Sequence, residues 1–192
     1  MKKNDTKRHG RIFRQSMNEL KITRNMVLCG LMAALAVIMG TFASVKIGPY
    51  LKIGFSEYPN RIVEFLFGPA VGAFFGTALD LIKFFVSPDG MFNPIYTIIA
   101  FISGLGGGYI LYRKKPTWKR VLLSQLYMKL FVNIVLNTFA MYITLGDGVI
   151  GMVPFRIVKN LVQLPVDTII LYFVLNYIAK LAKKEKYFEK DL

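Results

Sequence analysis

The chain has almost none of the residues that build disulfides, metal centres or nucleophilic active sites. It contains one cysteine, Cys29, and one histidine, His9, among 192 residues. A disulfide within the chain is therefore excluded, and a Cys/His metal site is not expected. A Ser/His/Asp or Cys/His catalytic set would need His9, which lies in the charged segment before the first apolar run. We expect no catalytic residue, no metal and no cofactor.

Acidic residues are scarce as well, with 11 Asp and Glu against 25 Lys and Arg, for a net charge of +14. Such an excess can indicate a nucleic-acid partner. Here, however, the cations cluster beside apolar segments: eight precede Met26, five lie in Arg113–Arg120 and five in Lys180–Lys190. Cations at the ends of apolar segments are typical of the cytoplasmic side of a membrane protein. We therefore expect contact with membrane lipid and no nucleic acid.

Apolar residues are abundant: the chain is 54% hydrophobic, with a mean hydropathy of +0.45. Long apolar runs indicate a membrane protein. Because about 20 residues cross a bilayer as a helix, the run Phe55–Phe67 is short for a span. Six spans nevertheless place all three basic clusters on one side, whereas five would split them, so the positive-inside rule favours six. The predicted spans are Met26–Val45, Phe55–Phe67, Ala70–Val86, Pro94–Tyr112, Val121–Leu145 and Met152–Leu181.

The predicted fold is an all-α integral membrane protein with six transmembrane helices in one compact bundle and both termini in the cytoplasm. It divides into a basic cytoplasmic tail (1–25), a membrane domain (26–181) and a charged cytoplasmic tail (182–192). In the first tail, Ser16 and Glu19 match a capping box ahead of an apolar run, which predicts a helix start. A short helix lying on the inner membrane surface is also expected there, from the apolar residues interleaved with arginines: Ile12, Phe13, Met17 and Leu20. The external loop Lys46–Gly54 is expected to form a hairpin-like cap.

Polar residues recur at steps of three or four inside four predicted spans, and therefore share one face of each helix. Since lipid cannot satisfy them, these faces should turn inward and line a water-accessible pocket that opens outward. Lys129 lies deeper than the other cations and is expected to snorkel toward the cytoplasm. For any single residue the alternative is a structural pair, such as Glu57–Arg61. The four faces are Glu57, Asn60, Arg61 and Glu64; Thr77, Asp80 and Lys83; Gln125, Lys129, Asn133 and Asn137; and Arg156, Lys159, Asn160, Gln163 and Asp167.

Small residues on two spans indicate close contact between helices. On the first span, Gly30 and Ala34 form a small-xxx-small step, with Ala33 beside them. This step lets another helix approach closely, either within the chain or in a partner protein. The glycines of GLGGGY, Gly104–Tyr109, lack the Gly-Lys-Ser/Thr ending of a phosphate-binding loop. They favour close helix packing instead.

Two stretches of the sequence resemble a known family. SMNELKITRNMVLCGLMAALAVIM begins at Ser16, and LKIGFSEYPNRIVEFLFGPAVGAFFGTALDLIKFFVSPDGMFNP ends at Pro94. Their ordered motifs are IGF-S, FGP-x-x-G, the in-helix Asp80 and the Pro-x-Gly of Ser87–Gly90. Together they resemble the substrate-binding (S) components of energy-coupling-factor vitamin transporters, and most closely the folate-specific subgroup.

The resemblance implies a non-catalytic, multi-pass subunit of a bacterial cell-membrane importer. In this family, six helices form an outward-facing pocket, and the S component docks on a transmembrane coupling protein with two cytoplasmic ATPases. It then topples within the membrane and carries its pocket inward. Small residues on the first helix form the docking surface, which maps here to Gly30, Ala33 and Ala34, although the family commonly has alanine at the first and last of these positions.

The folate-specific resemblance also suggests ligand contacts. A carboxylate such as Asp80 could pair with the amino group and ring N–H of a pterin, and Arg156 or Lys159 with the glutamate carboxylates. Aromatic rings would stack on the flat ligand. The full set of expected substrate-binding residues is Asp80, Lys83, Arg156, Lys159, Asn160, Gln163, Asn133, Asn137, Arg61, Phe55, Phe92 and Tyr96.

Three other functions remain open at this point. A family member could bind another vitamin or precursor, such as thiamine or a queuosine precursor, and a cationic ligand would favour the acidic residues over Arg156 and Lys159. A stand-alone membrane channel or carrier would move its solute without ATPases. A membrane-embedded enzyme would need turnover that depends on Asp80 or Asp167.

Overall fold

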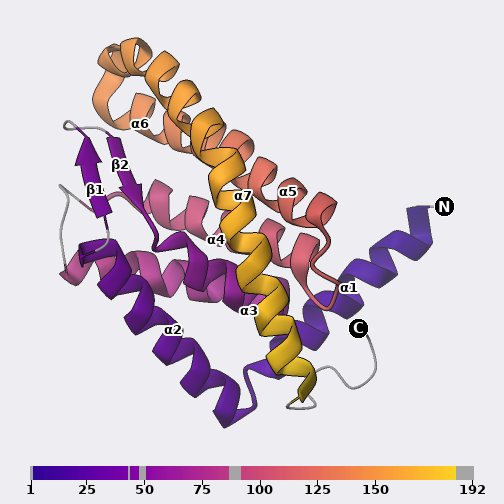
Figure 1. The fold of residues 1–192 in the computed structure, drawn as a ribbon. Coiled ribbons are helices and arrows are strands. Elements are labelled where there is room, and N and C mark those ends of the chain that lie inside the picture. The colour runs from indigo at the N-terminus through magenta and orange to yellow at the C-terminus, as the bar shows by residue number, and fades with distance from the viewer. Residues whose placement is uncertain (1, 43, 48–50, 87–91, 185–192) are drawn as a thin grey trace.

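The computed structural model describes residues 2–42, 44–47, 51–86 and 92–184. Its helices form a bundle with one short β-hairpin (Figure 1). The predicted turn Ser87–Gly90 lies outside the described residues, as does most of the predicted C-terminal tail. In chain order the elements are α1 Lys2–Glu19, α2 Thr23–Phe42, β1 Ser44–Ile47, β2 Leu51–Gly54, α3 Glu57–Val86, α4 Pro94–Leu111, α5 Trp118–Leu126, η1 Tyr127–Leu136, α6 Asn137–Leu145, η2 Gly146–Met152 and α7 Val153–Lys184.

Five helices in the described part of the chain are long and apolar enough to cross a membrane, which confirms the predicted helical membrane protein. One of them runs without interruption through α5, the π-helix η1 and α6. The first predicted span was placed too late, because Val45 belongs to strand β1 rather than to α2. The five helices are Thr23–Phe42, Glu57–Val86, Pro94–Leu111, Trp118–Thr144 and Val153–Lys183.

Helix α3 contains the two runs that the sequence separated at Gly68-Pro69. Gly68 has φ +89°, a left-handed conformation that favours glycine, and it interrupts the helical geometry. A Cβ placed on Gly72 would lie 2.7 Å from Cγ of Glu64. In an unbroken helix these two residues would be about 12 Å apart along the axis. The chain therefore folds back at Gly68, and segments 57–67 and 69–86 lie side by side.

Ser16 completes this turn from a different helix. The prediction that Ser16 and Glu19 begin a helix is wrong, because both lie in the last turn of α1. The buried Ser16 hydroxyl donates to the Phe67 carbonyl (2.6 Å) and accepts from the backbone N–H groups of Ala70 (3.0 Å) and Val71 (3.1 Å). It thus binds first-turn N–H groups of segment 69–86 that have no partner within their own helix.

Glycines bring α4 against segment 69–86, as expected for close packing. A Cβ on Gly76 would meet the Ala100 carbonyl oxygen at 2.8 Å, and one on Gly72 would meet the Gly104 carbonyl oxygen at 2.9 Å. These pairs show that α4 runs antiparallel to the segment. Side chains larger than hydrogen would separate the two backbones, so the GLGGGY stretch serves packing.

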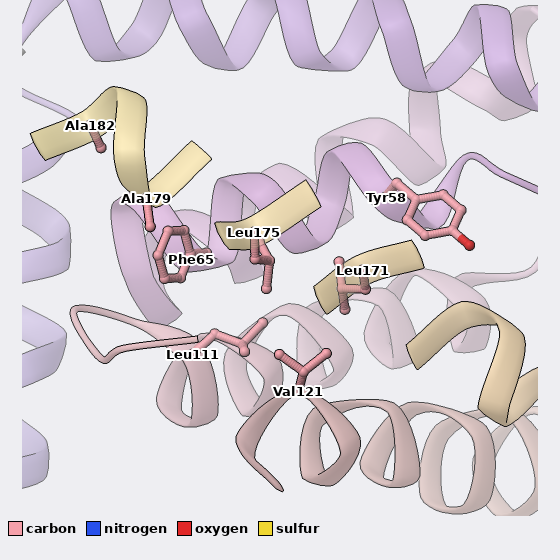
Figure 2. Close-up of a cluster of buried hydrophobic side chains, with 8 residues drawn as sticks. All are labelled: Tyr58, Phe65, Leu111, Val121, Leu171, Leu175, Ala179 and Ala182. Atoms are coloured by element: carbon pink, nitrogen blue, oxygen red, sulfur yellow. The ribbon is translucent and has the colours of Figure 1, made fainter. Parts of the chain in front are cut away.

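Two apolar clusters hold the remaining helices. Residues of α2 pack on α3 around Ala36, Val63, Phe67, Val71, Phe75 and Leu79. Helix α7 crosses the bundle and packs on α3, α4 and α5 through a second cluster (Figure 2). Its side chains converge from four helices; they are Tyr58, Phe65, Leu111, Val121, Leu171, Leu175, Ala179 and Ala182.

The hairpin and the basic segments lie at opposite ends of the bundle (Figure 1). Strands β1 and β2 pair antiparallel from Ser44↔Gly54 to Ile47↔Leu51, which confirms the predicted hairpin. At the other end, the Glu19 carboxylate accepts hydrogen bonds from Tyr112 (3.2 Å) and Arg113 (3.1 Å). The end of α1 is thereby joined to the α4–α5 loop.

We predict that Ser16→Ala lowers the thermal unfolding midpoint, because it leaves polar groups at the Gly68 turn without partners. The expected loss is about 1–3 kcal/mol. Ser124→Ala is the matched control: its buried hydroxyl makes no hydrogen bond within the described residues, so its removal should be neutral or stabilising. Thermal unfolding in detergent checks both variants, and equal midpoints would contradict the assigned role of Ser16.

Candidate functional site

A buried ionic network joins α3, η1 and α7 in the middle of the bundle. Lys129 Nζ lies 2.7 Å from Asp167 Oδ2 and 3.4 Å from Glu57 Oε2. The Tyr58 hydroxyl donates to the other Asp167 oxygen at 2.9 Å. Only 3% of the Lys129 side chain is exposed, so the prediction that it snorkels toward the cytoplasm is wrong. Its ammonium is instead held by two carboxylates from other helices.

The widened backbone of η1 carries Lys129 and Asn133 into this network. The Asn137 N–H donates to the Val132 carbonyl, five residues back, as in a π-helix. Such segments are rare and frequently lie at functional sites. In this chain η1 carries Lys129, which contacts both α3 and α7, and Asn133, which contacts α7.

Amide side chains extend the network toward the hairpin end. Asn137 donates to Asn133 at 3.1 Å, and Asn133 donates to Asn160 on α7 at 3.4 Å. One turn away, Arg156 donates to the Thr138 hydroxyl at 3.2 Å. The polar faces predicted on these two helices therefore face each other.

The charge of this region is positive. Lys159 lies within electrostatic range of Glu57, Lys129, Arg156 and Asp167. The described cluster thus combines three cations (Lys129, Arg156 and Lys159) with two carboxylates (Glu57 and Asp167). Tyr96 of α4 lies within electrostatic range of Arg156, so its ring borders the same region. Gln163 is half-buried one turn further along α7.

Asp80 and Lys83 lie on the second segment of α3 and make separate contacts. Asp80 Oδ2 accepts a hydrogen bond of 2.7 Å from Thr97 on α4. Lys83 Nζ donates to Ser56, just before α3, at 2.9 Å. Thr97 follows Tyr96 in the first turn of α4, so this turn links the Asp80 contact to the Arg156 region.

The two phenylalanines predicted to stack on a ligand are both more than one-third exposed. Phe55 is 38% exposed and stacks on Tyr58, with ring centroids 6.0 Å apart. Phe92 is 45% exposed and meets Phe84 edge to face at 5.2 Å. Both rings lie near the hairpin end, beside the starts of α3 and α4.

Arg61, which was also predicted to bind the substrate, is buried among side chains of α3 and α4. Its guanidinium is 2.6 Å from Glu64 Oε2 and 3.2 Å from the Ser103 hydroxyl, and both charged side chains are almost fully buried. The predicted structural pair Glu57–Arg61 does not form. Arg61 binds Glu64 instead, and Glu57 binds Lys129. Arg61 and Glu64 also surround Gly107, where a side chain would have no room.

The small residues of α2 divide between two faces. Gly30 and Ala34 are exposed, and a Cβ on Gly30 would meet no atom of the described chain within 4 Å. Ala33 packs against the α2–α3 apolar cluster. The face formed by Gly30 and Ala34 is thus available to another helix, while Ala33 supports the fold.

Several hydrogen-bond partners of the charged residues could not be found from the sequence, because they belong to no periodic pattern. Ser56, Thr97 and Thr138 each bind one charged residue, although a lone hydroxyl in an apolar helix gives no periodic signal. Tyr58 differs, because it directly follows Glu57, the first residue of a predicted polar face, and could have been included with it.

Apolar helices surrounding buried ionic and amide side chains are the arrangement expected of a membrane protein that binds a polar solute. The chain belongs to the family of ECF transporter substrate-specific components, because that family's model matches residues 24–175.

Similar proteins include two folate transporters named FolT. The protein from Clostridium novyi (strain NT) is 29% identical over 153 residues, covering 80% of this chain and 88% of that protein. The protein from Leuconostoc mesenteroides subsp. mesenteroides is 27% identical, covering 80% and 85% respectively. The riboflavin transporter RibU of Staphylococcus aureus (strain TCH60) is 25% identical, covering 85% and 93%. A crystal structure of FolT bound with folic acid matches with a TM-score of 0.74 and 27% identity, over 82% of this chain and 97% of that one.

We predict that Arg61→Leu destabilises the protein strongly, because it leaves the Glu64 carboxylate buried without its cation. Breaking a buried pair in this way typically costs about 3–5 kcal/mol. The double variant R61L/E64L should unfold at a higher temperature than R61L, since it removes both charges. If both variants unfold alike, the pair does not behave as a coupled structural unit.

Proposed function

We propose that this chain is the folate-binding subunit of an ATP-driven vitamin importer in a bacterial cell membrane. Membership of the substrate-specific family supports a binding role, and the two FolT relatives support folate. The observation that carries the choice of ligand is the positive surplus beside α7, where three cations face two carboxylates. This surplus attracts a ligand that has carboxylates of its own.

Charge also separates folate from the other vitamins. Folate carries two carboxylates, thiamine is cationic, and the isoalloxazine and ribityl groups of riboflavin are uncharged. A cationic ligand would add to the surplus of Arg156 and Lys159, and like charges within a few ångströms repel in a low-dielectric interior. A neutral ligand would leave the surplus unbalanced. The site chemistry therefore favours folate over riboflavin, the substrate in the name of the third relative.

The proposed contacts follow the two parts of the ligand. Arg156 and Lys159 bind glutamate carboxylates, helped by the amides of Asn133, Asn137, Asn160 and Gln163. Asp80, beside the first turn of α4, binds the pterin edge, and Lys83, one turn further along α3, binds a carboxylate of the ligand. Phe55, Phe92 and Tyr96 supply stacking surfaces. Arg61 has a structural role, because Glu64 and Ser103 already engage its guanidinium.

The membrane arrangement follows from the turn at Gly68. We propose that segments 57–67 and 69–86 cross as separate helices, which makes six spans from the five apolar helices. All basic clusters then lie on the cytoplasmic side with both termini. The hairpin, Arg156 and Lys159 lie toward the outside, so the pocket receives its ligand from there.

Energy for uptake comes from partner proteins. We propose that the exposed Gly30 and Ala34 of α2 contact a transmembrane coupling protein, which joins the chain to two cytoplasmic ATPases. Small residues allow this close helix contact, and the exposed apolar face around them, including Val27, Leu31 and Ile38, would otherwise meet lipid.

We predict that Arg156→Gln weakens folate binding by about 1.5–3 kcal/mol, the usual range for a hydrogen bond to a charged group. Pteroic acid, which lacks the glutamate, should bind both proteins nearly equally. Arg14→Gln is the matched control, because Arg14 is exposed on α1. Isothermal titration measures the affinity of each purified protein for each of the two ligands. An equal loss of affinity for folate and for pteroic acid in the Arg156 variant would contradict carboxylate recognition by Arg156.

The same measurement locates the pterin. Asp80→Asn should weaken folate and pteroic acid alike, by about 1–3 kcal/mol, because both ligands carry the pterin. Unchanged affinity in a folded variant would leave Asp80 with only its Thr97 contact. Tight binding of riboflavin instead of folate would overturn the assigned substrate.

We predict that Ala34→Leu abolishes folate uptake while leaving folate binding intact, because leucine prevents close approach of the coupling protein. Ala78→Leu is the matched control, since Ala78 is exposed on α3 away from this face. Uptake by vesicles containing the full transporter and titration of the isolated chain distinguish the two effects. Loss of binding in the Ala34 variant would mean that this residue packs within the chain.

A further inference from the structure

A basic groove lies at the end of the bundle opposite the hairpin, away from the ligand residues. It has a volume of about 440 Å³ and lies between the α4–α5 loop and the last turns of α7. Three lysines line it, Lys115 from the loop and Lys180 and Lys183 from α7, together with Trp118 and Tyr172. No acidic side chain lines it within the described residues.

The groove is a built feature rather than a chance gap between helices. Asn176 Nδ2 donates to the Pro116 carbonyl (3.3 Å) and to the Tyr172 carbonyl (2.8 Å), which fixes the loop against α7. Trp118 and Tyr172 meet edge to face, with ring centroids 5.6 Å apart. The loop and α7 thus hold the two rings and the three lysines in one place.

Its position along the helices matches the membrane–water interface. Trp118 is the first residue of one membrane-spanning helix, and Lys183 is the last residue of another. Tryptophan and tyrosine favour the level of lipid headgroups, and lysines there face the aqueous side. Phe173, which is 67% exposed beside Tyr172, continues the surface toward the apolar part of α7.

The two lysines that α7 contributes to the groove make no polar contact of their own in the described part of the chain. Within the part of the chain that the structure describes, Lys180 and Lys183 make no hydrogen bond or ion pair. A second basic groove lies on the other side of Thr117, and there the cations differ. Two of its three cations are engaged, since Lys114 donates to the Tyr109 carbonyl (2.7 Å) and Arg120 to the Lys115 carbonyl (2.8 Å), and Lys119 is the third. The groove at α7 is therefore better suited to an external anion.

We propose that the groove formed by Lys115, Trp118, Tyr172, Asn176, Lys180 and Lys183 binds the phosphate headgroup of an anionic phospholipid. Basic pockets between membrane helices on the cytoplasmic side bind such headgroups. The lysines contact the phosphate, the Trp118 and Tyr172 rings lie at the glycerol level, and the acyl chains follow the exposed apolar surface of α7. A free anion would use the lysines but not the apolar surface.

The sole tryptophan of the chain provides a local readout, because it lines the groove. The full chain is reconstituted in vesicles of phosphatidylcholine and phosphatidylglycerol, with bromine on the acyl chains of one lipid at a time. Bromine quenches Trp118 only nearby, so quenching reports which lipid occupies the groove. We expect brominated phosphatidylglycerol to be preferred about fivefold or more, the factor equivalent to about 1 kcal/mol for one lysine near anionic lipid.

The double variant K180Q/K183Q should reduce this preference by the larger factor, and K115Q by a smaller one, because one lysine or two remain in the groove. The matched control is R11Q/R14Q, which removes two exposed cations at the same spacing on α1 and should retain the preference. Equal quenching by both lipids in the unmodified protein would overturn the proposal, as would an unchanged preference in K180Q/K183Q. An equal loss in R11Q/R14Q would show general surface attraction and also overturn it.

A further arm separates a lipid from a free anion. Inorganic phosphate replaces chloride at constant ionic strength while brominated phosphatidylglycerol is present. Quenching of Trp118 should not change if the lipid is anchored by its chains as well as its headgroup. Recovery of fluorescence with phosphate would assign the groove to a soluble anion and overturn the lipid proposal.

Discussion

Burial of Lys129 between Glu57 and Asp167 is the constraint on which the rest of the bundle depends. A charge removed from water is stable only when opposite charges and hydrogen bonds surround it, and lipid supplies neither. The start of α3, the π-helix η1 and the middle of α7 must therefore meet at one point. The Asn133–Asn160 and Arg156–Thr138 contacts then follow along the same two helices.

The turn at Gly68 solves a second problem, that of breaking a helix within an apolar environment. The left-handed Gly68 and the following Pro69 end one helical segment and begin another, which exposes backbone N–H groups. Ser16 reaches these groups from α1, and a Cβ on Gly68 would collide with the Tyr112 ring at 2.8 Å. The last turn of the basic N-terminal helix thus belongs to the packed structure.

The sequence predicted the elements better than their contacts, for a physical reason. Apolar length identified the helices, and Gly68-Pro69 marked the break in α3, because both are local properties. The stripes on η1 and α7 were also visible from their spacing. The partners of Lys129 were not, since Glu57 lies 72 residues away and only the folded bundle brings it near. Ser16 was misassigned for the same reason: a capping motif was visible locally, but its hydroxyl serves a turn more than 50 residues away.

The residues proposed to bind the solute, the partner protein and the lipid headgroup lie on three separate surfaces of one small bundle. Arg156 and Lys159 of α7 lie near the hairpin, the small residues Gly30 and Ala34 face outward on α2, and the basic groove lies at the opposite end. Helix α2 packs on α3 along its inner face, and it approaches the polar residues where a Cβ on Gly40 would lie 3.8 Å from Lys83 Cε. Because few side chains belong to more than one of these surfaces, a substitution on one surface leaves the charges and hydrogen bonds of the others in place. The side chains proposed to bind the solute and those proposed to dock a partner protein therefore lie on different helices of the bundle.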